Sequence, residues 1–299
     1  MNKPERQGAA EDAPAVLYLS EDNSVEAVLS RFDNAANPRL KAVMTSIIKH
    51  LHAVVKETEP TFEEWLTAID FLTRTGQKCD DRRQEWILMS DTLGVSMLLD
   101  AINHRKPSNA TQTTVLGPFH VEDAPVKNMG DDVNLGGEGP PLVMSGRVLD
   151  RHGRPIEGAT LDIWQANDEG FYDVQQPGIQ PDMNLRGIFK TGADGRFWFR
   201  TARPRYYPVP TDGPVGELLM ALGRHPYRPA HIHFLVKAPG LEPLVTHLFV
   251  RGDPYLTSDA VFGVKEALII DFDEHDDPAA AAKHGVGNPF FTANYDFVL

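Results

Sequence analysis

The segment that decides the fold is Pro229-Ala-His-Ile-His-Phe-Leu-Val236. Side chains along a β-strand point alternately to opposite faces of the sheet. A strand here places His231 and His233 on one face, and it places three apolar side chains on the other, namely Ile232, Phe234 and Val236. Two imidazoles held together on a rigid strand are a natural start to a metal site, although a hydrogen-bonded or surface pair gives the same isolated pattern.

Short apolar segments bounded by turn residues occur on both sides of this strand. They cover residues 142–150, 158–164, 196–200, 244–250 and 266–272. In one of them Phe197 and Phe199 alternate with Arg196, Trp198 and Arg200, as in a strand with one buried face. Such regularly spaced short strands are typical of an antiparallel β-sandwich.

The first third of the chain has a different composition. Of 24 glycines only three precede residue 107, and of 23 prolines only four do. Both residues break helices, so this region is expected to be helical. Asn37-Pro38 and the capping box Thr61-Phe-Glu-Glu64 mark two helix starts. Further helices are expected after Ser24 and over residues 80–105.

Apolar residues recur at three- and four-residue steps in these helices, which predicts stripes that pack together in a helical layer. The sequence therefore predicts an α+β protein. Residues 1–111 are expected to form an N-terminal helical domain, and residues 112–299 are expected to form a β-sandwich domain.

Charge and cysteine content exclude several classes of function. The chain has 42 acidic and 29 basic residues, for a net charge of −13, which argues against nucleic acid or anionic membranes as partners. It contains no run of about 18 apolar residues and starts without the apolar core of a secretory signal. The only cysteine, Cys79, fits a reducing compartment. We expect a cytoplasmic protein.

Tyrosines offer further ligands beside the two histidines. Tyr172 lies in a Gly- and Asp-containing segment, and Tyr206 and Tyr207 lie between prolines. Phenolate is a hard anionic oxygen donor that suits ferric iron better than zinc. The spacing alone leaves open whether these tyrosines bind a metal or only pack their rings.

Three longer motifs carry a resemblance to a known family. They are Leu161-Asp-Ile-Trp-Gln-Ala-Asn-Asp-Glu-Gly-Phe-Tyr172, Pro204-Arg-Tyr-Tyr-Pro208 and Gly223-Arg-His-Pro-Tyr-Arg-Pro-Ala-His-Ile-His233. Together they resemble the intradiol ring-cleavage dioxygenases, non-haem Fe(III) enzymes that open catechols between the two hydroxyl-bearing carbons. The resemblance covers essentially the whole chain. Residues 90–97, 115–119, 207–216 and 258–264 are most similar to the family's hydroxyquinol 1,2-dioxygenases.

The resemblance implies a set of site residues. It places Tyr172, Tyr207, His231 and His233 on Fe(III), with Tyr207 preferred over Tyr206 by the register of the motif. It makes Tyr207 the ligand that leaves the metal and takes a substrate proton, and it makes Arg228 the cation facing the substrate. The implied pocket residues are Leu88, Asp91, Val115, Leu116, Gly117, Pro118, Phe119, Val209, Pro210 and Val261.

Two pocket residues bear on the choice of substrate. Asp91 either accepts a hydrogen bond from a third ring hydroxyl, as hydroxyquinol (benzene-1,2,4-triol) would supply, or is an exposed helical carboxylate. His247 replaces a glutamine of many relatives, and it is expected to bind near the substrate or O₂, to be a spare ligand, or to be a buried hydrogen-bonded residue. Catechol or a chlorocatechol is the alternative substrate.

Other classes of protein fit parts of the sequence. His231, His233 and His247 could form a three-histidine zinc site for hydration or hydrolysis. Residues 145–159 also resemble the first hairpin of transthyretin-like binding modules. For partners, the resemblance implies a homodimer through the N-terminal helices, often with a phospholipid held between them.

Overall fold

The computed structural model describes residues 17–80 and 83–299, which form two compact units divided between Asp70 and Phe71. Within the described residues, no helix is both long enough and apolar enough to cross a membrane. The domain boundary predicted after residue 111 stays a prediction. Each unit is described by itself below.

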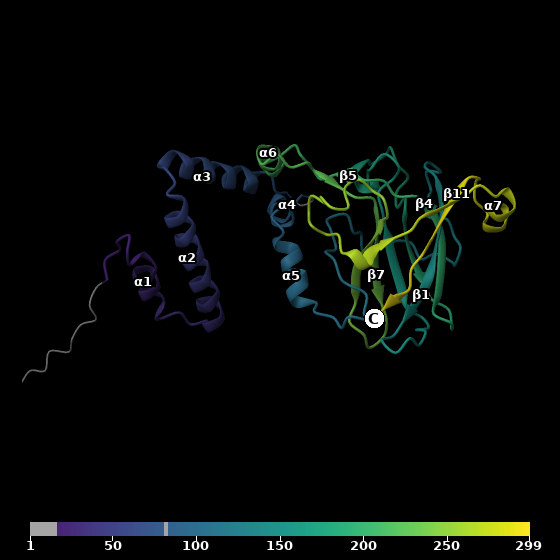
Figure 1. The fold of residues 1–299 in the computed structure, drawn as a ribbon, viewed down its shortest axis with the longest axis horizontal. Helices are drawn as coiled ribbons and strands as arrows, with labels where there is room; N and C mark the ends of the chain where they lie inside the picture. The colour runs from purple at the N-terminus through teal and green to yellow at the C-terminus, as the bar shows by residue number, and fades with distance from the viewer. Residues whose placement is uncertain (1–16, 81–82) are drawn as a thin grey trace, which may run out of the picture. The chain divides into compact units, whose positions relative to one another are not determined.

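The first unit consists of helices whose starts follow the sequence signals (Figure 1). Its elements are α1 (Ser24–Leu29), η1 (Ser30–Phe32), α2 (Pro38–Thr58) and the beginning of α3 (Phe62–Gln77). The Asn37 side chain accepts a hydrogen bond from the Leu40 amide at 3.1 Å. The Glu64 carboxylate accepts from the Thr61 amide at 2.8 Å, and the Glu64 amide donates to the Thr61 hydroxyl at 3.2 Å. Both predicted helix caps are confirmed.

The apolar stripes of these helices are uncovered. Helix α2 has no buried residue, and Leu51 and Trp65 are 57% and 52% exposed. The prediction that the stripes pack together is wrong within this unit. The physical reason is that the described residues of this unit provide no second layer against which both α2 and α3 could bury an apolar face.

The described residues of the second unit form four further α-helices: α4 (Glu85–Thr92), α5 (Val95–Asn103), α6 (Pro214–Ala221) and α7 (Pro278–His284). The single helix predicted over residues 80–105 is therefore wrong in extent. Its expected start includes residues 81–82, which lie outside the described residues. Gly94 has φ +75°, a left-handed conformation that breaks the helical path between α4 and α5.

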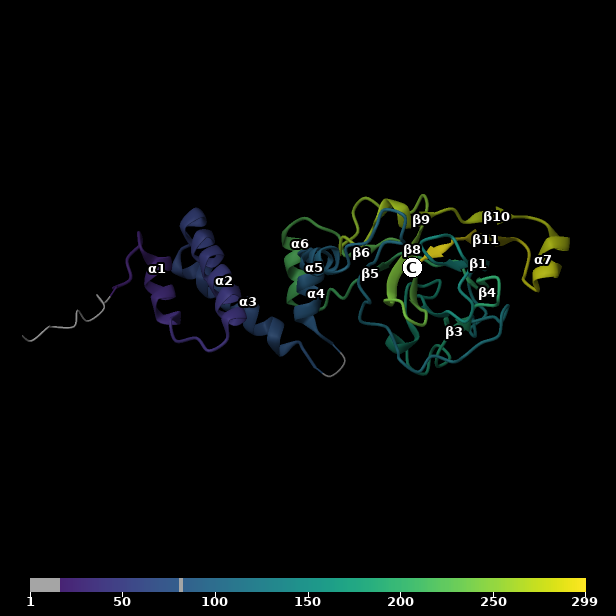
Figure 2. The same ribbon diagram turned by 90° about the horizontal axis from the view of Figure 1, so that it is seen from below.

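Two five-stranded sheets and a small two-stranded sheet make up the rest of this unit (Figure 2). The first sheet has the order β10-β11-β1-β12 with β4 also paired to β1, and the second has the order β3-β2-β7-β8-β9. The first sheet contains β1 (Pro141–Leu149), β4 (Arg196–Ala202), β10 (Asp273–His275), β11 (Phe290–Asn294) and β12 (Phe297–Val298). The second contains β2 (Thr160–Trp164), β3 (Arg186–Lys190), β7 (His231–Lys237), β8 (Leu244–Val250) and β9 (Ile269–Ile270). The small sheet pairs β5 (Tyr207–Pro208) with β6 (Tyr227–Arg228).

The core lies between the two five-stranded sheets. It is built from buried side chains of β1 and β4 on one side and of β2, β7 and β8 on the other, including Leu142, Phe197, Phe199, Ile163, Ile232 and Phe234. The β-sandwich and the α+β class are confirmed. The sheets are mixed rather than purely antiparallel, because β1 pairs in parallel with β11 and β12, and β8 pairs in parallel with β9. Of the strand predicted over 266–272, only β9 forms, after the short helix η3 (Glu266–Leu268).

Candidate metal centre

Three neighbouring strands align the residues at the centre of the site. Trp164 of β2 is the cross-strand partner of His233 on β7, and His233 is the partner of His247 on β8. Cross-strand partners share one face of a sheet, so these three side chains form a row. His231 lies two residues before His233 and joins the same face, while Ile232 enters the core as the alternation predicts.

Four potential ligand atoms converge beside this row. The His231 and His233 Nε2 atoms are 3.2 Å apart, and the Tyr172 hydroxyl lies 3.0 Å from His233 Nε2. The Tyr172 hydroxyl donates to the Tyr207 hydroxyl at 3.4 Å. Tyr206, by contrast, packs its ring on Tyr227 and Tyr255. The structure therefore brings Tyr207, and not its neighbour Tyr206, to the other three residues.

The protonation of His231 is fixed by its surroundings. Its Nδ1 lies 2.7 Å from the Pro229 carbonyl oxygen, which can only accept, so Nδ1 carries the proton. The lone pair of Nε2 therefore faces the converging atoms, as metal-binding histidines require. Burial, together with the charge of Arg228, lowers the pKa of His231 to about 3. Burial also lowers the pKa of His233 well below its usual value, so both rings stay neutral.

The donor set fits a metal ion. Nitrogen and oxygen ligands about 2.1 Å from one ion, at angles of about 90–110°, lie roughly 3.0–3.4 Å from each other. The three contacts among the four residues fall in this range, from 3.0 to 3.4 Å. Burial and the neighbouring Tyr207 raise the pKa of the Tyr172 hydroxyl well above its usual value in the protein alone. A strongly acidic metal ion is what such a buried phenol needs to lose its proton.

The loop that carries Tyr172 is held by a buried ion pair. Asp173 follows Tyr172 at the start of η2 (Asp173–Gln175), and its Oδ1 accepts from Arg186 Nε at 2.8 Å and Nη2 at 2.6 Å. Arg186 Nη1 donates to the Phe119 carbonyl at 2.7 Å. The Phe119 ring stacks on the Tyr172 ring with centroids 4.4 Å apart. One guanidinium thus fixes the positions of both rings.

His247 is completely buried, and neither of its ring nitrogens has a hydrogen-bond partner among the residues that the structure describes. Its ring centroid lies 4.1 Å from that of His233, and the ligand atoms of His231, His233 and His247 lie within 4.8 Å of one another. An unsatisfied buried polar group costs about 1–3 kcal/mol, so this imidazole is expected to gain a partner in the working enzyme.

Arg228 approaches the cluster from the small sheet. It is the cross-strand partner of Tyr207, is 5% exposed, and places Nη1 3.4 Å from His231 Nε2. Burial disfavours its charged form, but the charge and hydrogen bonds of Asp259, together with Tyr207 and Tyr172, outweigh this and raise the pKa of the guanidinium. A permanent positive charge therefore lies beside the converging ligand atoms.

A cavity of about 960 Å³ adjoins this cluster. It is lined by eight of the predicted pocket residues, namely Leu88, Asp91, Val115, Leu116, Gly117, Pro118, Phe119 and Pro210. At Gly117 an added Cβ would lie 3.2 Å from the His233 ring, and Phe119 stacks on Tyr172. The cavity wall is therefore in direct contact with the cluster.

The other predicted pocket residues lie behind this wall. Val209 and Val261 are buried in an apolar cluster against which Leu88 packs. Arg228 and His247 lie at the histidine row rather than in the cavity lining. The structure places these four residues next to the cavity without placing them on its surface.

Sequence reasoning assigned no role to several residues that shape this site. Asp173 and Arg186 anchor the Tyr172 loop, and Asp259 pairs with Arg228. Asp173 could have been found from the sequence, because it directly follows Tyr172, which was already a candidate ligand. Asp259 lies in the segment 258–264 that carried part of the family resemblance, but its pairing with Arg228 could not be predicted, since the two residues are 31 positions apart in the chain.

Comparisons with known proteins agree with this geometry. Family models described as "Catechol dioxygenase N terminus" and "Dioxygenase" match residues 37–111 and 115–299. The chain is 59% identical over 283 residues to a hydroxyquinol 1,2-dioxygenase of Rhizobium sp. (strain MTP-10005), covering 94% of this chain and 96% of that protein. It is 50% identical over 277 residues to a 6-chlorohydroxyquinol 1,2-dioxygenase of Cupriavidus pinatubonensis (strain JMP 134 / LMG 1197), covering 93% of this chain and 96% of that one.

Among solved structures, the hydroxyquinol 1,2-dioxygenase from Pseudomonas putida DLL-E4 superposes with a TM-score of 0.87 at 50% identity, covering 93% of this chain and 97% of that one. These matches favour the dioxygenase prediction over the zinc-enzyme and binding-module alternatives. The α+β fold, the converging side chains and the relatives all agree, and the chain belongs to the intradiol ring-cleavage dioxygenase family.

Proposed function

We propose that this dioxygenase cleaves hydroxyquinol with O₂ to 3-hydroxy-cis,cis-muconate, the enol form of maleylacetate, in the breakdown of aromatic compounds. The observation that carries the proposal is the contact between the four converging ligand residues and a cavity that Asp91 lines. The other acidic residue of the lining, Glu85, is already paired with Arg83. The high identity to proteins named for hydroxyquinol and chlorohydroxyquinol supports the same substrate class.

Tyr172, Tyr207, His231 and His233 are the proposed ligands of a ferric ion. Their two phenol oxygens and two imidazole nitrogens form a hard donor set, as Fe(III) prefers. The ion, when bound, supplies Lewis-acid activation of the two adjacent ring hydroxyls. The protein's own contribution is to hold these groups rigidly, through the β7 strand and the Asp173–Arg186 pair.

Tyr207 and Arg228 are the proposed catalytic residues. The Tyr207 oxygen, which accepts a hydrogen bond from Tyr172, would be a phenolate while it holds the ferric ion. In that form it can take up the proton of a substrate hydroxyl and become a neutral phenol. Arg228 cannot lose its proton, and it offers a fixed positive charge to the oxygen on which negative charge grows. Their pairing across β5 and β6 keeps the proton acceptor and the cation side by side.

Asp91 is the residue proposed to recognise the third ring hydroxyl of the substrate. Burial raises the pKa of its carboxyl, while a hydrogen bond with Ser96 and the charge of Arg228 lower it. Both Asp91 and Ser96 line the cavity. Catechol would leave the carboxylate without its hydroxyl partner, and a site built for a hydroxyl rejects the analogue that lacks it. Catechol or a chlorocatechol remains the alternative substrate.

His247 and the buried valines complete the proposed substrate site. One nitrogen of the His247 ring must carry a proton, and this N–H is free to donate to bound substrate or O₂. Val209 and Val261 support the wall through Leu88, opposite the peptide segment 115–119 and Pro210.

The helical region is proposed to mediate assembly. Its exposed apolar side chains on α2 and α3 support a homodimer through these helices, and a phospholipid tail is the proposed further partner. This assigns dimerisation and part of the pocket to residues 1–111 and the iron site to residues 112–299. The single cysteine supports a cytoplasmic location.

The test combines colour and turnover. Purified protein loaded with ferric iron is expected to be wine-red, because charge transfer from phenolate to iron absorbs visible light. Anaerobic hydroxyquinol should change this spectrum, and O₂ uptake should be faster with hydroxyquinol than with catechol or a chlorocatechol. A colourless iron-loaded protein would overturn the metal assignment, and catechol exceeding hydroxyquinol would overturn the substrate.

A further inference from the structure

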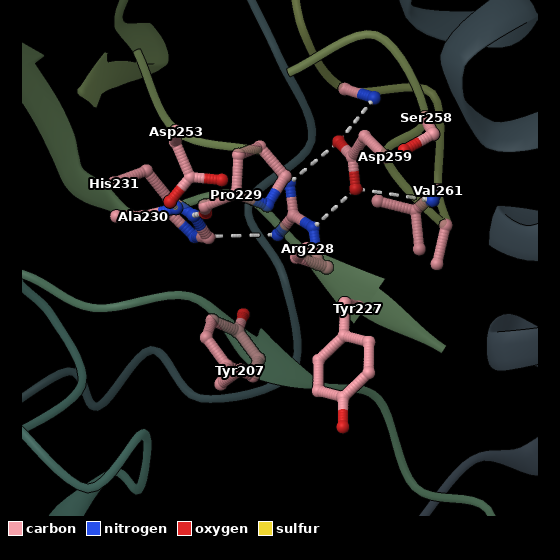
Figure 3. Close-up of polar contacts among 12 residues, drawn as sticks. Tyr207, Tyr227, Arg228, Pro229, Ala230, His231, Asp253, Ser258, Asp259 and Val261 are labelled. Atoms are coloured by element: carbon pink, nitrogen blue, oxygen red, sulfur yellow. Dashed lines mark hydrogen bonds and ion pairs between the residues drawn. The ribbon is translucent and has the colours of Figure 1, made fainter. Parts of the chain in front are cut away.

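Asp259 holds the Arg228 guanidinium from the side away from His231 (Figure 3). Its Oδ1 accepts from Arg228 Nε at 3.2 Å, and its Oδ2 accepts from Arg228 Nη2 at 3.4 Å. Only Nη1 of the guanidinium is directed to His231. Figure 3 also shows the Tyr207 hydroxyl pointing toward this group and the Tyr227 hydroxyl pointing away.

Every lone-pair direction of the Asp259 carboxylate is used. Besides the two contacts with Arg228, Oδ1 accepts from the Val261 amide at 3.3 Å and Oδ2 accepts from the Gly263 amide at 2.8 Å. The carboxylate is 4% exposed, so water cannot replace a lost partner. A buried, fully bonded, bidentate pair of this kind fixes a guanidinium in one orientation.

The same loop supports the pocket wall from behind. The Ala260 amide donates to the Tyr227 carbonyl at 3.1 Å, which attaches the loop to the strand that carries Arg228. Val261 packs in the apolar cluster that supports Leu88 of α4. Asp259 thus lies where the pocket wall, the small sheet and the catalytic cation meet.

We propose that Asp259 is a positioning residue, which orients Arg228 toward the reacting oxygen and couples that orientation to the pocket wall at Val261. The inference rests on the proposed function, because it acts through the role assigned to Arg228. Asp259 itself touches neither the substrate cavity nor the four ligand residues, so its effect on turnover passes through the guanidinium. A misplaced catalytic group can cost on the order of 100-fold in rate.

Gly263 provides an independent way to disturb the same contact. A Cβ added there would lie 2.8 Å from Arg228 Nη2 and 3.1 Å from Asp259 Oδ2. Gly263→Ala therefore pushes the guanidinium away while leaving both charges in place. If Asp259 works by orienting Arg228, this variant and Asp259→Asn must have the same effect.

The experiment measures kcat, KM and iron colour for both variants, with the diol that the wild type turns over. We expect kcat to fall about 10- to 100-fold, KM to change less than about 3-fold and the visible band to persist. Asp271→Asn is the matched control, because it removes a carboxylate from a surface pair with Arg251. It should keep kcat within about twofold.

A double-mutant cycle separates positioning from a general structural role. In an Arg228→Gln background, Asp259→Asn should change kcat less than about twofold, because the group it orients is gone. Retained kcat in both single variants, or full additivity in the cycle, would overturn the inference. A wild type inactive with every diol would instead refute the proposed function, so the two failures are distinguishable.

Discussion

The two units of this protein break the usual rule of burial in opposite directions. The helical unit exposes apolar side chains, such as Leu51 and Trp65, that a folded domain would be expected to bury. The sandwich unit buries polar and ionisable ones, including His231, His247 and Arg228, that would be expected in water. Each departure costs free energy in the isolated chain.

Exposed apolar side chains in one unit and buried polar side chains in the other indicate that the two units bind different kinds of partner. Exposed apolar area is relieved by another apolar surface, and this is the basis of the proposed homodimer through the helices. Buried imidazole and phenol groups are relieved by a metal ion and a polar substrate, so the sandwich favours catalysis. If this comparison is right, changes in the two units should affect different measurements.

The largest effect is expected from Tyr172→Phe. Removing one phenol oxygen from the converging set should abolish most of the visible band and lower kcat at least about 1,000-fold, or roughly 4 kcal/mol. Tyr206→Phe is the matched control, because that ring packs on Tyr227 and Tyr255 instead. Equal loss of colour in both variants would contradict the ligand assignment.

The buried histidines should make metal-free protein unstable in mild acid. Burial lowers the pKa of His231 to about 3 and lowers the pKa of His233 and His247 well below 6.5. Between these values the unfolded chain binds more protons, so stability is lost as the pH falls from about 6.5 toward 3. Each histidine contributes up to about 1.4 kcal/mol per pH unit.

Urea unfolding at pH 7, 6 and 5 measures this slope. His247→Gln should reduce the dependence of the unfolding free energy on pH by the equivalent of about one bound proton. Replacement of the exposed His152 by Gln is the control and should leave this slope unchanged. A stability that stays flat from pH 7 to 5 would show that these rings are not buried as neutral groups.

Asp91→Asn tests the specificity of the sandwich pocket. The amide still fills the cavity but no longer offers a carboxylate to the third hydroxyl. We expect the ratio of kcat/KM for hydroxyquinol to that for catechol to fall about 10- to 100-fold. An unchanged ratio, measured by O₂ uptake, would remove Asp91 from substrate recognition.

The smallest effect is expected in the helical unit. Ile47→Glu together with Leu51→Glu places two charges on the exposed apolar stripe of α2 and should weaken a dimer at least about 10-fold, with kcat less affected. Sedimentation across a concentration series measures this, with Lys49→Glu on the same helix as the control. Wild-type protein that is only monomeric at micromolar concentration would contradict the proposed dimer.

Local sequence predicted much of the fold because the forces involved act over a few residues. Helix caps at Asn37 and Thr61 and the strand alternation around His233 depend on backbone geometry within one turn or one pleat. The break at Gly94 was missed because the apolar spacing continues across it. The stripes were expected to be covered because periodicity shows which face is apolar, not what lies against it.

The candidate site divides in the same way. The sequence by itself determined the strand that presents His231 and His233, the likeness to intradiol dioxygenases and a pocket of which eight residues line the observed cavity. Two features could be learned from the tertiary structure alone: His247 has no hydrogen-bond partner among the described residues, and Asp259 binds Arg228. The tertiary structure also brings Tyr207, which the motif register already preferred over Tyr206, to Tyr172. These contacts join residues far apart in the chain, and their geometry depends on how whole strands and loops pack, which no local pattern encodes.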